Sequence, residues 1–208
     1  ESYAGSILST AALGASAFAM VAGEMAFNAV ILPMVIAGIG VLASIIGVFT
    51  VRTKEGATQK ELLKSLGFGI NVSSVIIILG SLGAVYLLLP GHMGVFGSIV
   101  VGLMVGIVVG KSVEYFTSES YRPTRGIAAK AETGEATVII DGLSTGMIST
   151  AIPVLSIVAG IIGAFALAGG FHNAIMGLYG IGIAAVGMLS TLGMTLATDA
   201  YGPIADNA

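Results

Sequence analysis

The chain has 208 residues, of which 56% are hydrophobic and only 9% are charged, and its formal net charge is −3. A soluble domain carries about 25% charged residues, so this composition excludes a surface that lies mostly in water. With 11 acidic and 8 basic side chains the chain lacks the excess positive charge of nucleic-acid-binding proteins, and without cysteine it forms no disulfide. The mean hydropathy of +1.03 predicts an all-α integral membrane protein.

Six apolar stretches are each long enough to cross a bilayer, which takes about 20 residues. They cover approximately residues 1–22, 29–50, 66–89, 95–116, 138–168 and 174–208. Residues 1–208 are therefore predicted to form a single transmembrane region, with the fifth stretch bent at Pro153. Because the sequence starts at Glu1 with neither a Met nor a signal peptide, we expect it to be part of a larger bundle.

All eight lysines and arginines lie in or beside two polar connections, residues 51–65 and 117–137. If six spans alternate in direction, these two connections emerge on the same side of the membrane, and the other connections emerge on the opposite side. Basic residues accumulate in cytoplasmic loops. The sequence therefore predicts that both basic connections, and the end of the chain near residue 208, are cytoplasmic.

Two groups of small or polar residues inside the predicted spans are assigned to helix packing. Gly102, Gly106 and Gly110 recur at every fourth position, and such a stripe lets membrane helices cross closely, with a channel wall as the alternative. A polar group in the third stretch is expected to hydrogen-bond between helices rather than to take part in transport. It consists of Asn71, Ser73 and Ser74.

Five acidic residues lie outside the two basic connections, and charge inside a membrane is costly enough that it normally marks a functional or paired site. They are Glu1, Glu24, Asp141, Asp199 and Asp206. Glu24 falls at a turn and is expected to be solvated. Asp141 lies near the start of the fifth stretch, where solvation or helix capping is preferred over an ion site.

The last ten residues carry two of these carboxylates, seven positions apart. Two helical turns place Asp199 and Asp206 on one face, about 10 Å apart along the axis, and Pro203 between them is expected to kink the helix. No Lys or Arg lies in this stretch, so the carboxylates need an external cation, and hard divalent ions such as Mg²⁺ prefer carboxylate oxygens. The residues predict a cation site at the cytoplasmic mouth; pairing with Lys or Arg elsewhere is the alternative.

Several motifs resemble those of membrane-bound, ion-translocating inorganic pyrophosphatases. The most specific is TDAYGPIADNA at residues 198–208. Further segments that resemble the family are GMLST at 187–191, GKSVEYFTS at 110–118, YRPT at 121–124, TGEAT at 133–137 and GLS at 142–144. The resemblance is strong from residue 110 to the end and weaker over residues 10–100.

The resemblance implies an enzyme that hydrolyses pyrophosphate to two phosphates with Mg²⁺ and pumps H⁺ or Na⁺ outward across a prokaryotic cell membrane. It implies a homodimer with sixteen helices per subunit, of which this chain supplies six, and it allows K⁺ as a second cofactor. It assigns Asp199 and Asp206 as catalytic residues that bind Mg²⁺ and pyrophosphate, and Asn207 as a further substrate-binding residue.

The first residues match a second family motif. Glu1-Ser2-Tyr3 resembles the end of a string on the family's sixth helix, where the Glu is the ion gate and the adjacent Ser helps to coordinate Na⁺. The resemblance therefore implies that Glu1 and Ser2 form an ion gate, which suits a carboxylate that alternately holds and releases a cation. A solvated Glu at the end of the chain is the alternative.

The family's remaining Asp and Lys residues lie outside this chain, so the catalytic set here is incomplete and the piece alone is expected to be inactive. Two other functions stay open on the residues. One is a secondary cation transporter with an intramembrane carboxylate site, since broken helices and buried acids occur there too. The other is a purely structural bundle, which the unpaired Asp199 and Asp206 disfavour.

Overall fold

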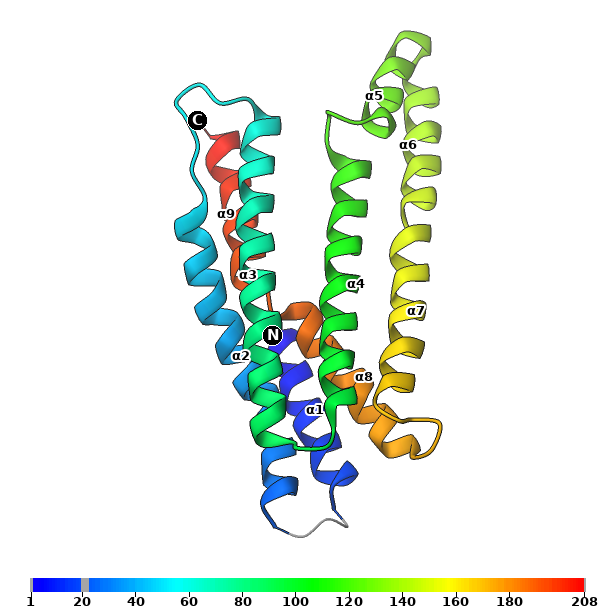
Figure 1. Cartoon of the computed structure of the whole chain (residues 1–208). Coiled ribbons are helices and arrows are strands. Elements are labelled where there is room, and N and C mark those ends of the chain that lie inside the picture. Colours follow the sequence, from blue (N-terminus) through cyan, green and yellow to red (C-terminus); the bar gives the residue numbers. More distant parts are fainter. Residues whose placement is uncertain (1, 20–22, 208) are drawn as a thin grey trace. The chain divides into compact units, whose positions relative to one another are not determined.

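The computed structural model describes residues 2–19 and 23–207, and this part of the chain is helical without any strand (Figure 1). Its helices are α1 (Ser2–Ala17), α2 (Glu24–Thr50), α3 (Gln59–Leu88), α4 (Met93–Thr117), α5 (Arg122–Ala129), the 3₁₀ helix η1 (Lys130–Thr133), α6 (Glu135–Ser149), α7 (Ala151–Leu167), α8 (Ala174–Leu189) and α9 (Leu192–Asp206). The prediction of an all-α fold is confirmed.

The chain divides into two compact units, which are described separately. The first comprises Glu1–Leu103 with Ile161–Ala208, and the second comprises Met104–Gly160. The first unit contains α1, α2, α3, α8 and α9 with the adjoining ends of α4 and α7. It therefore holds all of the predicted site residues that the structure describes.

Five stretches of the described chain are long and apolar enough to cross a membrane. They are Glu24–Thr50, Glu61–Leu88, Met93–Thr133, Glu135–Leu167 and Ala174–Ala197. They correspond to the second to sixth predicted spans. The first predicted span is shorter than expected within the described residues, because α1 has 16 residues and residues 20–22 lie outside them.

The last two spans are each interrupted once. The fifth breaks at Thr150, three residues before Pro153, whose ring nitrogen cannot donate to the carbonyl of Ser149. The sixth breaks at Ser190 and Thr191 instead of at Pro203, and α9 is one unbroken helix from Leu192 to Asp206. The fifth span is thus interrupted three residues before Pro153, where a bend was predicted, and α9 continues without a break through Pro203, where a kink was predicted.

The first basic connection is shorter than predicted, because α3 begins at Gln59 and not at residue 66. The helix start is fixed by a capping box: the Thr58 hydroxyl accepts from the Glu61 backbone N–H, and the Glu61 carboxylate accepts from the Thr58 N–H at 2.8 Å. The second connection is also structured, since it contains α5 and η1. The Thr-x-x-Glu pattern at residues 58–61 was the sequence signal for the first correction.

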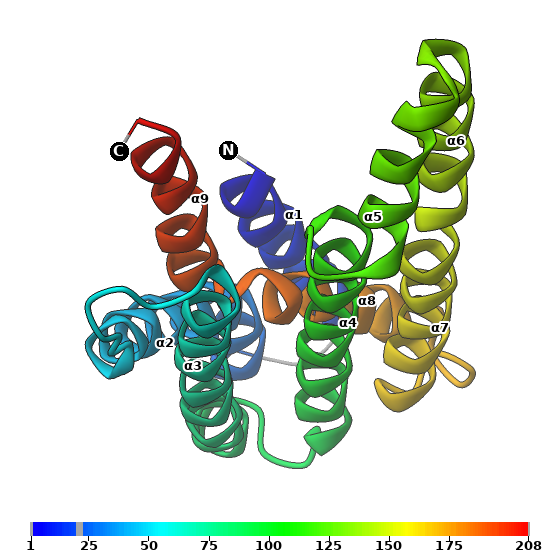
Figure 2. The same cartoon turned by 90° about the horizontal axis from the view of Figure 1, so that it is seen from above.

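Close helix crossings hold the first unit together, and glycine makes them possible. Figure 2 shows α8 crossing beside α1, and a Cβ added at Gly182 of α8 would lie 2.8 Å from the Thr10 hydroxyl. A Cβ at Gly102 of α4 would overlap the backbone of Ala184 in α8, so the predicted packing role of this glycine is confirmed. A Cβ at Gly110 would meet nothing within 4 Å.

Polar side chains join helices within the first unit. The Ser73 hydroxyl donates to the Ala43 carbonyl at 2.9 Å, and the Tyr179 hydroxyl donates to the Ala29 carbonyl at 3.0 Å. The expectation for Ser73 is therefore confirmed, whereas Ser74 donates within its own helix to Ile70 and Asn71 is exposed. Interhelical hydrogen bonds of this kind satisfy groups that lipid cannot.

The turn between α7 and α8 shows why the sixth span begins where it does. Gly169 has a positive φ of 85°, and Gly170 donates its backbone N–H to the Phe165 carbonyl at 2.8 Å, which completes a Schellman motif at the end of α7. The Asn173 side chain then accepts from the N–H groups of Ile175 and Met176 and caps α8.

Candidate functional site

The two candidate carboxylates lie on α9, the last helix. Asp199 is exposed in the middle of the helix, and Asp206 is its final residue. Asn207 follows in a turn, is exposed, and takes part in a further interaction within the chain. Since the helix is unbroken between them, positions 199 and 206 are separated by about 10 Å along one axis.

Contacts near the start of α9 fix its position against α2. A Cβ at Gly40 would collide with the Ser190 backbone, and a Cβ at Gly193 would lie 2.7 Å from the Ser44 Cβ. The two helices therefore run parallel, with Ser44 of α2 level with Gly193 of α9. Asp199 lies six residues beyond Gly193, so it is level with about Thr50, the last residue of α2.

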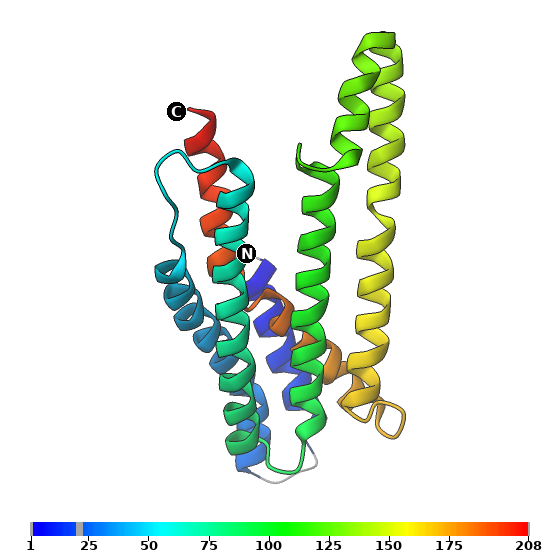
Figure 3. The same ribbon diagram turned by 45° about the horizontal axis from the view of Figure 1, so that its top comes forward.

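Contacts with α3, which runs antiparallel to α9, place the end of α9 at the same level. A Cβ at Gly69 would lie 2.7 Å from the terminal methyl of Met194, which is fully buried. Because α3 runs antiparallel to α9, the end of α9 comes level with the start of α3 and with the loop of residues 51–58 before it (Figure 3). The acidic end of α9 and the first basic connection thus lie at one end of the first unit.

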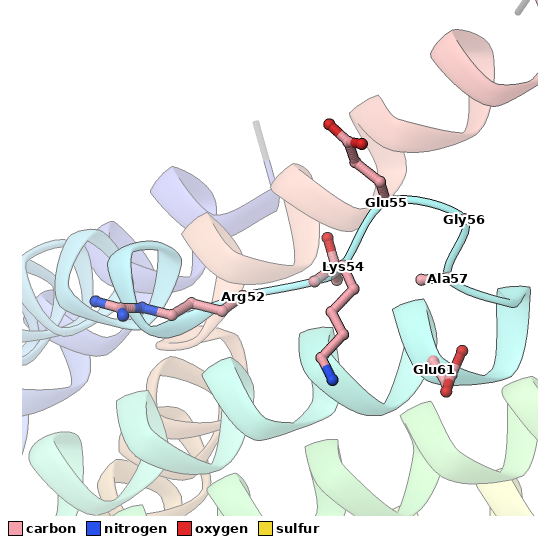
Figure 4. A pocket seen from close by; sticks show the side chains of 7 residues that line it. Arg52, Lys54, Glu55, Gly56, Ala57 and Glu61 are labelled. Carbon is pink, nitrogen blue, oxygen red and sulfur yellow. The ribbon is translucent and has the colours of Figure 1, made fainter.

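The loop of residues 51–58 is built by hydrogen bonds at both of its ends. The Ser65 hydroxyl accepts from the Arg52 N–H at 3.2 Å and donates to the Arg52 carbonyl at 2.9 Å. At the other end the capping box holds Thr58, and between them Gly56 turns the chain with a φ of 75°. The loop encloses an open hollow of about 400 Å³ lined by charged side chains from Arg52 to Glu61 (Figure 4).

The described residues alone do not assemble a metal centre. Among the residues whose side chains the structure describes, which do not include Asp206, no three His, Cys, Asp or Glu side chains gather as a metal-binding group. Mg²⁺ holds oxygen ligands at about 2.0–2.1 Å, so two helix positions about 10 Å apart suit two separate ions better than one shared ion. Carboxylates are suitable donors for Mg²⁺, but further ligands must come from outside this set.

Of the two residues of the predicted ion gate, the structure describes only Ser2, the first residue of α1. Glu1 lies outside the described residues, and Ser2 is exposed at the start of α1, where its carbonyl accepts from the Ser6 hydroxyl at 2.9 Å. Gly14 packs against Ala29 of the antiparallel α2. Ser2 is therefore level with about residue 41, which is about 14 Å along α2 from the level of Asp199.

Asp141 does not cap a helix, because α6 begins at Glu135 and Asp141 is well inside it. It is half-buried within the second unit and lines an open hollow of about 300 Å³ with Tyr115, Arg122 and Thr145 among other residues. Of the two roles predicted for Asp141, helix capping is wrong, because the helix begins three residues earlier than predicted.

Sequence reasoning also missed a buried polar group near α9. The Ser44 hydroxyl is buried on α2 against Gly193 and has no hydrogen-bond partner within the described part of the chain. It lies beside the break between α8 and α9 at Ser190 and Thr191. The pattern Gly-Met-Leu-Ser-Thr gives no helix-breaking signal there, so only packing reveals this junction.

The complete chain, residues 1–208, matches the family model described as inorganic H⁺ pyrophosphatase. The chain belongs to this family. It is 62% identical over 212 residues to a protein of Bacteroides thetaiotaomicron named a putative K⁺-stimulated pyrophosphate-energized sodium pump, with all of this chain and 29% of that protein covered.

Two further relatives carry related names. A protein of Clostridium tetani with the same name is 43% identical over 208 residues, covering all of this chain and 29% of that protein. A protein of Methanosarcina mazei, named a K⁺-insensitive pyrophosphate-energized proton pump, is 43% identical over 182 residues, covering 87% of this chain and 26% of that protein. The chain thus spans 29% or less of the length of these curated relatives.

Proposed function

We propose that the protein containing this chain hydrolyses inorganic pyrophosphate and uses the reaction to pump a cation across the membrane. The observation that carries the proposal is the family match over the whole chain, which includes the carboxylate pair of α9. The geometry supports it, because Asp199 and Asp206 lie at the same end of the first unit as the basic loop of residues 51–58.

In this proposal α9 supplies part of the hydrolytic site. Asp199 and Asp206 each hold a different Mg²⁺, and Asn207 binds a phosphate oxygen through its amide. Bound Mg²⁺ neutralises the charge of pyrophosphate and polarises its oxygens. A carboxylate oxygen that does not bind Mg²⁺ would accept the proton of the attacking water, and the continuous helix spaces the two acids about 10 Å apart. Helices outside residues 1–208 complete the ligand set.

The site opens to the cytoplasm. The basic connections, residues 51–65 and 117–137 in the sequence analysis, are cytoplasmic in this proposal because positive charge is retained on that side. The acidic end of α9 then faces the compartment in which pyrophosphate is produced. The protein acts as a homodimer in a prokaryotic cell membrane, with the other helices of each subunit around this chain.

Ion passage uses the first helix. Glu1 is the gate carboxylate in this proposal, and Ser2 beside it is a ligand for the moving ion. The level of Ser2, about 14 Å from that of Asp199 along the helix axes, supports a gate inside the membrane and separate from the hydrolytic site. In this proposal α2, which packs against both α1 and α9, links the hydrolytic site to the gate.

The transported ion is Na⁺ in this proposal, and K⁺ stimulates the reaction. The support is the 62% identity to a protein named as a K⁺-stimulated sodium pump, against 43% to one named as a K⁺-insensitive proton pump. Radioactive Na⁺ uptake into proteoliposomes, measured with pyrophosphate and with or without K⁺, tests this assignment. Acidification of the lumen that is independent of Na⁺ would assign H⁺ instead.

The direct test of the function is phosphate release from pyrophosphate by membranes that contain the full-length protein. We expect release that requires Mg²⁺ and is lost in Asp199→Asn, while Glu24→Gln, a change in the first turn of α2 at the opposite end of the unit, retains it. Immunoblotting of the membranes controls for abundance. Absence of hydrolysis by the intact wild-type protein would favour the secondary cation transporter.

A further inference from the structure

The hairpin of α2 and α3 carries a long exposed apolar face that ends in basic residues. We propose that this face lies directly against the lipid bilayer, and that Arg52, Lys54 and Lys64 bind the headgroups of anionic phospholipids at its edge. This assignment of an outer, lipid-facing surface does not depend on the reaction proposed above.

Apart from the exposed Glu24 in its first turn, the exposed residues of α2 form one apolar stripe. They are Phe27, Met34, Gly38, Val41, Leu42, Ile45, Ile46, Val48 and Phe49. Their spacing of three, four and seven keeps them on one side of the helix, away from the buried glycine and serine face that packs against α3 and α9. The stripe contains no charged or polar side chain, which water would not leave exposed over this length.

On α3 a second stripe runs along one face. Its exposed members are Glu61, Lys64, Phe68, Asn71, Val75, Leu79, Leu82, Gly83, Tyr86 and Leu87. Its charged members lie at the start of the helix, and Asn71 lies one turn inside Phe68. From Val75 onward the stripe is apolar apart from the Tyr86 hydroxyl, which agrees with a hydrocarbon environment there.

Aromatic residues mark both ends of the two stripes at matching levels. Phe49 and Phe68 are 78% and 57% exposed, and Gly69 packs against Gly47 and Val51, which places these rings at the same level. Phe27 and Tyr86 are 65% and 69% exposed, and Asn28 donates to the Leu88 carbonyl at 3.0 Å, which aligns the other end.

The distance between the aromatic pairs matches a bilayer. At a rise of 1.5 Å per residue, Phe27 and Phe49 are about 33 Å apart along α2, and Phe68 and Tyr86 are about 27 Å apart along α3. The hydrocarbon core of a bilayer is about 30 Å thick, so both exposed apolar lengths match it. Tyr concentrates at the boundaries of the core, which suits Tyr86, while the apolar rings of Phe27, Phe49 and Phe68 suit its hydrocarbon side.

Basic side chains lie directly outside one aromatic pair. Arg52, Lys54 and Lys64 are exposed, and the hydrogen bonds between Arg52 and Ser65 hold the two chain segments side by side. The exposed Glu61 carboxylate accepts from the Thr58 N–H and hydroxyl through one of its oxygens. Figure 4 shows the side chains of Lys54 and Glu55 on opposite sides of the loop.

This order of groups fits an anionic lipid headgroup. Long basic side chains at a helix end reach the phosphate level while their stems stay on apolar surface. Each Lys or Arg near an anionic membrane surface contributes about 1 kcal/mol, which is about fivefold in affinity. The opposite end of the hairpin, at residues 89–92, carries no Lys or Arg, so the preference is restricted to one leaflet.

The first experiment measures what covers the face. Single cysteines replace Ile45, Leu79 and Glu55 in the full-length protein freed of other cysteines, are spin-labelled, and are studied in phosphatidylcholine vesicles. We expect the labels at 45 and 79 to collide with oxygen but not with a water-soluble nickel chelate, and the label at 55 to show the reverse. Low collision rates with both reagents at 45 and 79 would mean that protein covers this face and would overturn the proposal.

The second experiment tests the headgroup preference. A fluorescent probe at Phe68→Cys is quenched by nitroxide-labelled phosphatidylglycerol or phosphatidylcholine in mixed vesicles of the two lipids. We expect phosphatidylglycerol to quench several-fold more at equal mole fraction, and Arg52→Gln/Lys54→Gln/Lys64→Gln to bring the ratio close to one. The matched triple variant Lys111→Gln/Arg125→Gln/Lys130→Gln, in the second unit, leaves the ratio unchanged. Equal quenching in the wild-type protein, or a ratio that the first triple variant does not change, would overturn the headgroup assignment.

Discussion

The first residues of α9 and the residues that follow them differ in their surroundings. The first residues pack within this chain, since Met194 is buried against α3 and Gly193 lies on Ser44 of α2. From Thr195 to Asp199 the residues are mostly exposed, and here the first carboxylate occurs. The contacts of Gly193 and Met194 therefore fix the direction of the helix, while Thr195, Leu196 and Asp199 beyond them are exposed.

The largest expected effect concerns the two acidic residues of α9. Asp199→Asn and Asp206→Asn should each lower pyrophosphate hydrolysis at least about a hundredfold, because even groups that only support metal ligands contribute about 10–100-fold. The protein should remain folded in the membrane, since Asp199 is exposed and makes no contact that holds α9 in place. Steady-state hydrolysis with normal turnover in Asp206→Asn would remove that residue from the site.

The next effect concerns a close helix crossing in the first unit, where α4 meets α8. Gly102→Val should destabilise the protein by at least about 1–3 kcal/mol, because the new side chain would overlap the Ala184 backbone of α8, which cannot rearrange as a side chain can. Thermal inactivation in detergent measures the change. Gly110→Val is the matched control from the same stripe, where a Cβ has open space. Equal losses of stability in the two variants would mean that the overlap with Ala184 is not the cause, and that valine acts at both positions through the conformation of the α4 backbone.

A smaller effect is expected where the basic loop meets α3. Thr58→Ala removes the hydroxyl that accepts from the Glu61 N–H and should lower stability by about 1 kcal/mol. Thr58→Ser retains the hydroxyl and should behave like the wild-type protein. The measurement is again the midpoint of thermal inactivation, and an unchanged midpoint in Thr58→Ala would mean that α3 does not need this cap.

The smallest effect concerns a single interhelical hydrogen bond. Tyr179→Phe removes the hydroxyl that donates to the Ala29 carbonyl and leaves the buried ring in place. Bonds of this kind between membrane helices contribute about 0.6 kcal/mol on average, with a maximum of about 1.7. A loss well above that range, measured by chemical unfolding in mixed micelles, would show that the hydroxyl also supports a neighbouring group.

Glu1→Gln separates pumping from hydrolysis. In the proposed mechanism the variant keeps Mg²⁺-dependent phosphate release to some extent but loses ion uptake into proteoliposomes, because an amide cannot alternately bind and release a cation as a carboxylate does. Simultaneous measurement of both rates on one preparation provides the comparison. Full ion uptake by Glu1→Gln would exclude this residue as the gate.

The sequence by itself determined the fold class, the family and most of the helical spans. A 56% hydrophobic composition with 9% charge predicts membrane helices, and turn residues such as Pro90-Gly91 and Gly169-Gly170 mark where two of the connections lie. The motif of residues 198–208 identified the candidate carboxylates, because residue type and spacing are properties of the chain alone. The start of α3 was also readable, in the capping box of Thr58 and Glu61, but was placed too late.

Only the tertiary structure decided where the sixth span breaks, which faces are buried and how the elements align. The junction at Ser190 and Thr191 depends on close backbone contact with Gly40, and no local pattern encodes a contact between residues that far apart in the chain. The levels of Asp199 and Ser2 likewise follow from the glycine crossings of α1, α2 and α9. The lipid-facing stripe of α2 could not be separated from its buried face by sequence, since both are apolar, and packing against α1, α3 and α9 makes the distinction.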